Sequence, residues 1–257
     1  MKAPARLTLS VVPGIPLITP GVDLGAIIIA AMEKAAMPPQ PGDIVVVTQK
    51  VVSKAQGRYV DLAAVVASPR ARELAAALDK DARLVEVILS ESVRIVRSER
   101  GVLIVEHRDG YIAANAGVDR SNVAAAADGE VVLLLPRQCD AVAEGLRGQL
   151  QTHFKTVLGV IVSDSFGRPW RRGTVGVALG AAGIAALNDL RGEPDLYGRP
   201  LEVSATALAD EVASAASLLM GQAGESHPVV LVSGLAAAAA DVPASALIRP
   251  AAEDLFR

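Results

Sequence analysis

The feature that most constrains the fold is the segment 157–173, in which an uncharged run passes directly into charged and polar residues. Residues 157–162 are short, apolar and β-branched, which is typical of a buried strand. Asp164 and Ser165 follow, and we expect them where the strand gives way to a loop rich in glycine and proline. Because polar side chains can leave the core at the end of a strand, the segment predicts a sheet whose edge faces a crevice.

The residue types in this segment predict an anionic ligand. Adjacent carboxylate and hydroxyl oxygens suit Mg²⁺ or Mn²⁺, and the guanidinium groups of Arg168, Arg171 and Arg172 can hold phosphate or carboxylate. The alternative is ordinary turn chemistry with solvated arginines, because Asp and Ser often bond nearby backbone amides. The segment alone leaves both interpretations open and names no reaction.

Composition limits the fold and the class of partner. Hydrophobic residues make up 51% of the 257 residues and aromatic residues only 3%, so the core consists of Ala, Val, Leu and Ile, which favours helices packed closely against sheets. This length suits one large domain or two small ones. A net charge of −3 excludes nonspecific binding of nucleic acid or acidic membranes, so any anion site is local.

Cysteine usage and hydropathy point to the cytoplasm. Cys139 is the single cysteine, which permits no intrachain disulfide and suits a reducing compartment. The first six residues carry no apolar export signal, and the longest uncharged run, 174–187, is too short to span a membrane. Its glycines, Gly176, Gly180 and Gly183, permit close backbone packing but form neither of the common nucleotide-binding glycine motifs.

The pattern of apolar residues predicts a mixed α/β to α+β fold. Residues 93–114 are expected to form an antiparallel meander, because three short apolar runs are separated by turn residues. Asp210 is expected to cap the helix 211–220, which Gly221 closes. The strands expected are 7–12, 43–48, 93–97, 102–107, 111–114, 131–135, 157–162, 201–208 and 229–232. The helices expected are 24–32, 69–78 after Ser68, one from Asp81 to about Glu91, and 140–153.

Three further polar groups follow predicted elements. Lys50 and Lys54 come after the strand 43–48 and predict phosphate contacts, although solvated lysines on a surface helix would fit equally well. The segment 115–122 places Asp119 and Asn122 in a loop, where capping could explain some of its polar residues. A third group, Gln222 to His227, stands directly after Gly221.

Five motifs resemble those of the coenzyme F420-0:L-glutamate ligase family. They lie at residues 52–58 (VSKAQGR), 115–122 (NAGVDRSN), 163–173 (SDSFGRPWRRG), 195–199 (DLYGR) and 209–222. The resemblance runs from about Val12 to Gly234. It implies an α+β fold of one unit over residues 1–257, with two subdomains as the alternative, and an intertwined homodimer with nucleotide near its interface. It also implies no C-terminal flavin-type domain, because the chain ends at Arg257.

The resemblance implies a cytoplasmic, GTP-dependent ligase of F420 biosynthesis. Such an enzyme adds L-glutamate to a carboxylate of coenzyme F420-0, and γ-linked glutamates after it, through an acyl phosphate. This chemistry needs no protein nucleophile, which fits the lack of a Cys-His or Ser-His-Asp pattern. The alternatives are a ligase of the same scaffold for another F420 precursor or amino acid, and a non-catalytic nucleotide sensor.

The resemblance also implies a set of site residues. Two Mg²⁺ or Mn²⁺ ions, assisted by K⁺, would be held by Asp119, Asp164, Ser165 and Gln222. Asp164 would also be catalytic. From their place after the Asp164-Ser165 pair, we add the hypothesis that one or more of Arg168, Arg171 and Arg172 orient F420-0 or glutamate, with Trp170 packed beneath the arginine loop; the alternative is that these arginines pair with acidic residues across the dimer. GTP would contact Pro16, Leu17, Ile18, Thr19, Gln49, Lys50, Lys54, Asn122, Met220, Gly221, Gln222, Ala223, Gly224, Glu225, Ser226 and His227.

Two single positions and one pair of residues depart from the family pattern. The family often has Thr at the position of Ser165 and has Glu in other members at that of Gln222. Gln49-Lys50 does not reproduce a pair of small hydroxyl residues that some members carry.

Overall fold

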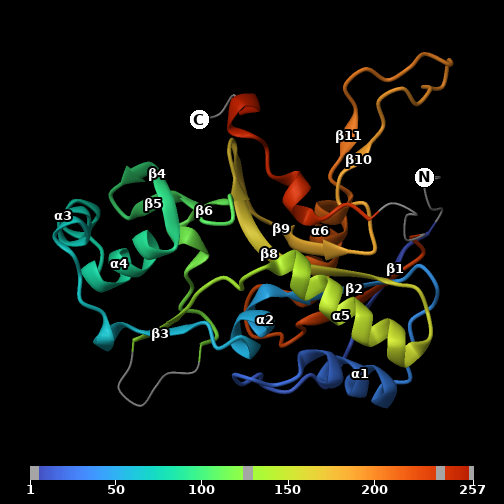
Figure 1. Ribbon diagram of the computed structural model, residues 1–257, viewed down its shortest axis with the longest axis horizontal. Helices are drawn as coiled ribbons and strands as arrows, with labels where there is room; N and C mark the ends of the chain where they lie inside the picture. Colours follow the sequence, from blue (N-terminus) through green and yellow to red (C-terminus); the bar gives the residue numbers. More distant parts are fainter. Residues whose placement is uncertain (1–5, 124–129, 236–240, 255–257) are drawn as a thin grey trace.

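A five-stranded mixed sheet forms the centre of the computed structural model, which describes residues 6–123, 130–235 and 241–254 (Figure 1). The start of the chain, where no export signal is expected, lies largely outside the described residues. The strand order is β1 (Thr8–Val11), β12 (Val229–Ser233), β2 (Ile44–Thr48), β8 (Gly159–Arg168) and β9 (Arg171–Ala182). Only β2 and β8 run parallel, and the other neighbours are antiparallel. The class is α+β, as predicted.

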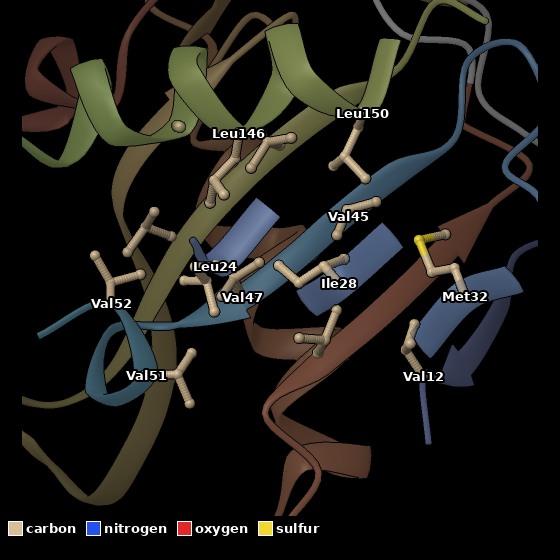
Figure 2. Close-up of a cluster of buried hydrophobic side chains, with 14 of the residues drawn as sticks. Val12, Leu24, Ile28, Met32, Val45, Val47, Val51, Val52, Leu146 and Leu150 are labelled. Atoms are coloured by element: carbon tan, nitrogen blue, oxygen red, sulfur yellow. The ribbon is translucent and has the colours of Figure 1, made fainter. Parts of the chain in front are cut away.

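Helices cover both faces of this sheet because its central strands are apolar on both sides. Val45 and Val47 of β2 point toward α1 (Leu24–Lys34) and α5 (Cys139–Phe154), as Figure 2 shows. Ile44 and Val46, on the opposite face, pack against α6 (Leu208–Met220). Successive side chains of a strand point to opposite faces of the sheet, so the uncharged residues of β2 are buried on both faces.

A smaller unit packs beside the sheet and contains the predicted meander (Figure 1). Its strands are β4 (Ser92–Glu99), β5 (Val102–His107) and β6 (Ile112–Ala114), covered on one face by α3 (Pro69–Leu78) and α4 (Ala82–Ser90). Ser68 and Asp81 cap these helices as predicted. The antiparallel ribbon of β3 (Tyr59–Asp61) and β7 (Val131–Leu133) lies between this unit and the sheet.

The predicted strand 201–208 is wrong. Only Ala205–Thr206 (β11) pair, with Asn188–Asp189 (β10), and the segment between them forms an arm that extends away from the body (Figure 1). Helix α6 already begins at Leu208, so Asp210 is not its cap. The Asp210 carboxylate instead accepts a hydrogen bond from the Ala178 amide of β9. None of the helices in the described ranges could cross a membrane.

The loop predicted after Asp164 is a β-hairpin. Strand β8 continues to Arg168, and the register pairs Arg168 with Arg171, so Pro169 and Trp170 form a two-residue turn. The remaining short elements are α2 (Gln49–Ala55) and the 3₁₀ helices η1 (Leu62–Ala64), η2 (Asn115–Gly117), η3 (Ala244–Leu247) and η4 (Ala251–Glu253).

The glycines of β9 allow helices to approach its backbone, as predicted. A Cβ atom at Gly176 would lie 2.3 Å from the carbonyl oxygen of Ala213 in α6, and one at Gly180 would lie 2.2 Å from that of Cys139 in α5. Real Cβ atoms never come so close to backbone oxygen, so a side chain at either position would push a helix off the sheet.

We expect Gly180→Ala to lower the free energy of unfolding by about 3 kcal/mol, because the added methyl group overlaps backbone that cannot rotate away. The matched control is Gly145→Ala in α5, where no atom lies within 4 Å of the added carbon. There the change should raise stability by about 0.5–1 kcal/mol, since alanine favours a helix. Urea denaturation measures both, and equal effects would contradict the assignment of Gly180 to a backbone contact.

Candidate active site

A cleft of about 1350 Å³ opens at the carboxyl ends of the parallel pair β2 and β8. In the register, Thr48 is the last residue of β2 and pairs with Ser163, so β8 has no neighbour on that side from Asp164 onward. The open edge leaves room for ligands between the main sheet and the meander unit. Such positions, outside the ends of parallel strands, are common binding sites.

Most of the predicted site residues line this cleft, although they come from five separate segments. The structure brings together Pro16, Leu17, Ile18, Gln49, Lys50, Lys54, Asp119, Asn122, Asp164, Ser165, Arg168, Met220, Gly221, Gln222, Ala223, Ser226 and His227. The predicted residues that do not line it are Thr19, Arg171, Arg172, Gly224 and Glu225.

Asp164 is the most perturbed of these groups. Burial raises the pKa of its carboxyl to about 6, although a hydrogen bond from the Ser165 amide, the charge of Lys50 and a hydrogen bond from Gln49 oppose the shift. Gln49 is itself buried and accepts a hydrogen bond from Ser53, at 3.0 Å, so its side chain is fixed beside Asp164. The cleft therefore contains a carboxylate poorly neutralised by the protein.

Asp119 is neutralised by Lys50. The Lys50 Nζ atom lies 2.7 Å from Oδ2 of Asp119, and the Ser121 amide donates to Oδ1 at 2.7 Å. Burial alone would raise the pKa of Asp119, but the Lys50 hydrogen bond and charge and the Ser121 contacts outweigh it, so the pKa is lowered. Lys50 also donates to the Ser121 hydroxyl, at 2.6 Å.

Lys54 and Asn122 connect three segments that are distant in sequence. The ammonium group of Lys54 donates to the Asn122 carbonyl oxygen, at 2.7 Å, and the Asn122 side-chain amide donates to the Ala223 carbonyl oxygen, at 3.0 Å. Burial, with a smaller effect from the charge of Lys50, lowers the pKa of Lys54. Two lysines on one turn of α2 thus give this end of the cleft its positive charge.

The loop after α6 is shaped by contacts of its own. Gly221 has φ 70°, a conformation that favours glycine, and Glu225 folds back so that its carboxylate accepts a hydrogen bond from the Ala223 amide at 2.8 Å. His227 Nδ1 contacts the Leu219 carbonyl oxygen at 3.0 Å. Glu225 therefore holds the loop rather than facing the cleft, whereas Ala223 and Ser226 line it.

The donor set suits a hard divalent cation only if the ligands include oxygens other than carboxylates. Asp119 and Asp164 repel each other, and this raises the pKa of Asp164, so a cation near both would relieve the repulsion. Within the described ranges, however, no three His, Cys, Asp or Glu side chains are grouped to hold a metal. Hydroxyl, amide or ligand phosphate oxygens would have to complete the coordination.

Of the three arginines of the hairpin, one lies in the cleft and two lie outside it. Arg168 lines the cleft and donates to the Gly173 carbonyl oxygen at 3.2 Å, whereas Arg171 and Arg172 lie on the exposed outer strand. The expectation that Trp170 packs beneath the loop is wrong, because 86% of its side chain is exposed. It occupies the turn of the hairpin, at one side of the cleft.

Several cleft residues were not singled out from the sequence. They are Val96, Arg97, Ile104 and Ile112 of the meander, Phe166 of β8, and Arg249 and Asp254 near the C-terminus. Residues 102–105 are all apolar, so the sequence does not reveal which face of this strand is open. Arg249 follows no predicted strand and carries no local signal of a site.

Comparison with known proteins places these features in a family. A family model for F420-0:Gamma-glutamyl ligase matches residues 14–234. Coenzyme F420:L-glutamate ligase of Methanothermobacter thermautotrophicus is 42% identical over 248 residues, covering 96% of this chain and 97% of the relative. The protein of the same name from Archaeoglobus fulgidus is 40% identical, covering 90% and 88%, and that of Methanocaldococcus jannaschii is 40% identical, covering 87% and 88%.

We expect Asp164→Asn to raise the thermal stability of the metal-free protein near neutral pH. The folded pKa of about 6 lies above the ordinary value of 3.8, so above both values the fold carries the cost of a buried charge. As the pH falls, the folded state takes up the proton first and the cost disappears by about pH 4. Differential scanning calorimetry should therefore show a midpoint gain of a few degrees that vanishes in acid.

Asp119→Asn is the matched control, and its effect on the thermal midpoint should have the opposite sign. The pKa of Asp119 is lowered, so its pairing with Lys50 stabilises the fold at neutral pH and is lost as the pH falls below the ordinary range of a carboxyl. This variant should have a lower midpoint than the wild type near neutral pH. A loss of stability in both variants would contradict the charge distribution described for the cleft.

Proposed function

Since the chain belongs to the F420-0:Gamma-glutamyl ligase family, we propose that it is a GTP-dependent ligase that joins L-glutamate to coenzyme F420-0 in F420 biosynthesis, with γ-linked glutamates following. The observation that carries the proposal is the cleft itself. Two lysines and two carboxylates from three segments meet at one edge of the sheet, in a chain similar over almost its whole length to relatives named coenzyme F420:L-glutamate ligase.

The reaction requires positioning more than covalent help from the protein. A carboxylate oxygen of F420-0 attacks the γ-phosphorus of GTP, GDP leaves, and an acyl phosphate forms. The glutamate amine then attacks the acyl carbon, loses a proton, and phosphate leaves. The protein would align the reactants and neutralise the phosphates.

The lysine end of the cleft would bind GTP. Lys50 and Lys54 supply the charge for the phosphates, and the segments 16–18 and 220–223 line the space around them. Asn122 lies between these groups through its bonds to Lys54 and Ala223. Thr19, Gly224 and Glu225 would act on the nucleotide only through the shape of their loops.

Asp119, Asp164, Ser165 and Gln222 would hold the divalent ions, Mg²⁺ or Mn²⁺, with K⁺ assisting. These ions would supply positive charge beside the transferring phosphoryl group. Asp164→Asn is then expected to lower turnover by orders of magnitude even though it stabilises the fold, because the neutral amide cannot offset the charge of the cation. Gln222 is exposed, so it could reach such an ion without displacing a buried partner.

The exposed apolar surface supports the proposed assembly. The arm exposes Leu196, Tyr197 and Val203, at 99%, 85% and 88%, and this apolar surface would be covered in an intertwined homodimer. All 257 residues would act as one unit, because the main sheet and the meander unit both line the cleft. A cytoplasmic location is proposed from the single cysteine, which suits a reducing compartment. Nucleic acid and membranes are not expected as partners.

Incubation of the protein with GTP, Mn²⁺, L-glutamate and coenzyme F420-0, followed by mass spectrometry, tests the function. The expected product gains the mass of one or more glutamyl residues, and GDP appears in equal number. Substitution of other amino acids for glutamate, and of F420 precursors for F420-0, tests the alternative substrates. GTP binding without any product in all combinations would indicate a nucleotide sensor and contradict the proposal.

Lys54→Ala should raise the KM for GTP about tenfold or more with little change in kcat, because a contact to phosphate made throughout the reaction contributes to binding only. Lys34→Ala is the control, since Lys34 is exposed at the end of α1, away from the cleft. Steady-state kinetics separates the two constants. An unchanged KM with a collapsed kcat would instead assign Lys54 to the transferring phosphoryl group.

Arg168→Lys should lower kcat/KM for F420-0 or glutamate while thermal stability is kept, because lysine keeps the charge but loses the planar fork that binds an oxyanion twice. Arg172→Lys should have no such effect, since Arg172 lies outside the cleft. Loss of stability with intact kinetics in the Arg168 variant would show a structural role.

A further inference from the structure

One face of the meander is left uncovered and forms a wall of the cleft. Leu103 and Val105 of β5 face the core with α3 and α4, so Ile104 between them faces the opposite way. The register places Arg97, Ile104 and Ala114 in one row across the three strands. The next row contains Glu106 and Ile112. Ile104 and Ile112 are half-buried and line the cleft.

The hairpin tip also lines the cleft and carries an unusual aromatic residue. Trp170 is the only tryptophan of the chain, has φ 65°, and is highly exposed. A bulky side chain in the left-handed region is strained. Phe166, on the same hairpin, lines the cleft and packs edge-on against Tyr111 at a ring distance of 6.1 Å.

Strain of this kind is retained where a side chain serves a ligand. We propose that the apolar wall of Ile104 and Ile112, together with Phe166 and Trp170, is the site for a planar heteroaromatic ring of the acceptor. The inference rests on the proposed function, because it assigns the acceptor to the part of the cleft that the nucleotide does not need.

Volume and charge support this division of the cleft. About 1350 Å³ exceeds the roughly 300–1000 Å³ of a pocket for one small ligand, so space remains beyond a nucleotide at the lysine end. Glutamate has no flat apolar surface that would require such a wall. Arg168 and Arg249 line the cleft, as does Arg97, which is paired with Glu99, so an apolar ring with an anionic tail, such as a phosphodiester, would be complementary to it.

Tryptophan emission provides a direct test, because Trp170 alone produces it. Titration of coenzyme F420-0 into the wild-type protein without GTP should quench this emission to saturation, whereas glutamate alone should leave it unchanged. Unquenched emission at F420-0 concentrations that saturate turnover would overturn the proposal. Quenching by GTP alone would also overturn it, since it would assign the wall to the nucleotide base.

Ile104→Ala should raise both the dissociation constant and the KM for F420-0 about tenfold, the effect of removing several apolar carbons from a binding wall, with the KM for GTP unchanged. The matched control is Val102→Ala, two residues away on the same strand and outside the cleft, which should change neither constant. Equal values for the two variants would refute the assignment of the wall.

Trp170→Gly distinguishes ligand binding from a structural role. Glycine adopts φ 65° without strain and little packing is lost, so the thermal midpoint should stay the same or rise, while calorimetry should show weaker binding of F420-0. A lower midpoint with unchanged affinity would overturn the proposal. F420-0 binding with these variant effects but without ligation would refute the proposed function and leave the ring site intact.

Discussion

The parallel pairing of β2 with β8 is the constraint on which the rest of the structure depends. Its register, from Ile44 opposite Gly159 to Thr48 opposite Ser163, sets where β2 ends and where β8 continues alone. The site exists because the two strands are unequal in length. Beyond the last pair, the chain of β2 turns into α2 and delivers Lys50 and Lys54, while β8 delivers Asp164 and Ser165 to the same edge. The antiparallel neighbours, β12 beside β2 and β9 beside β8, hold this pair in the centre of the sheet.

The cleft combines a satisfied ion pair with an unsatisfied carboxylate. Asp119 gains a lowered pKa from Lys50, whereas Asp164 has a raised one because burial dominates. A protein optimised only for stability would not retain the second arrangement, since a buried charge costs free energy unless something compensates it. The two aspartates would thus have different roles: Asp119 orients Lys50, and the charge of Asp164 remains available for a ligand.

The sequence predicts the parts of this fold in which local pattern and tertiary context agree. Asp164 and Lys54 follow apolar runs. A polar side chain that follows a buried strand is expected at the edge of the sheet, because burial in the core would cost free energy. The sequence predicts a loop in place of the hairpin, because Gly167 and Pro169 favour a loop and because tryptophan rarely adopts the positive φ that this turn requires. It predicts a cap at Asp210 because an acid near the start of a helix is typical of one, yet the partner of Asp210 is an amide on a distant strand. The open face of β5 could not be inferred, because its inward and outward residues are equally apolar.

The glycines of β9 have a consequence for the way substrates enter. Backbone of α5 and α6 rests directly on this strand at Gly180 and Gly176, so no adjustable side chain separates helix from sheet. The hairpin is an extension of the same strand and would therefore move as part of the sheet. Any widening of the cleft would have to come from the opposite wall, with the meander unit swinging on the β3–β7 ribbon. Exchange of a large acceptor and a nucleotide product would then depend on that two-stranded ribbon, whose Leu133 pairs with Asp119 at the edge of the cleft.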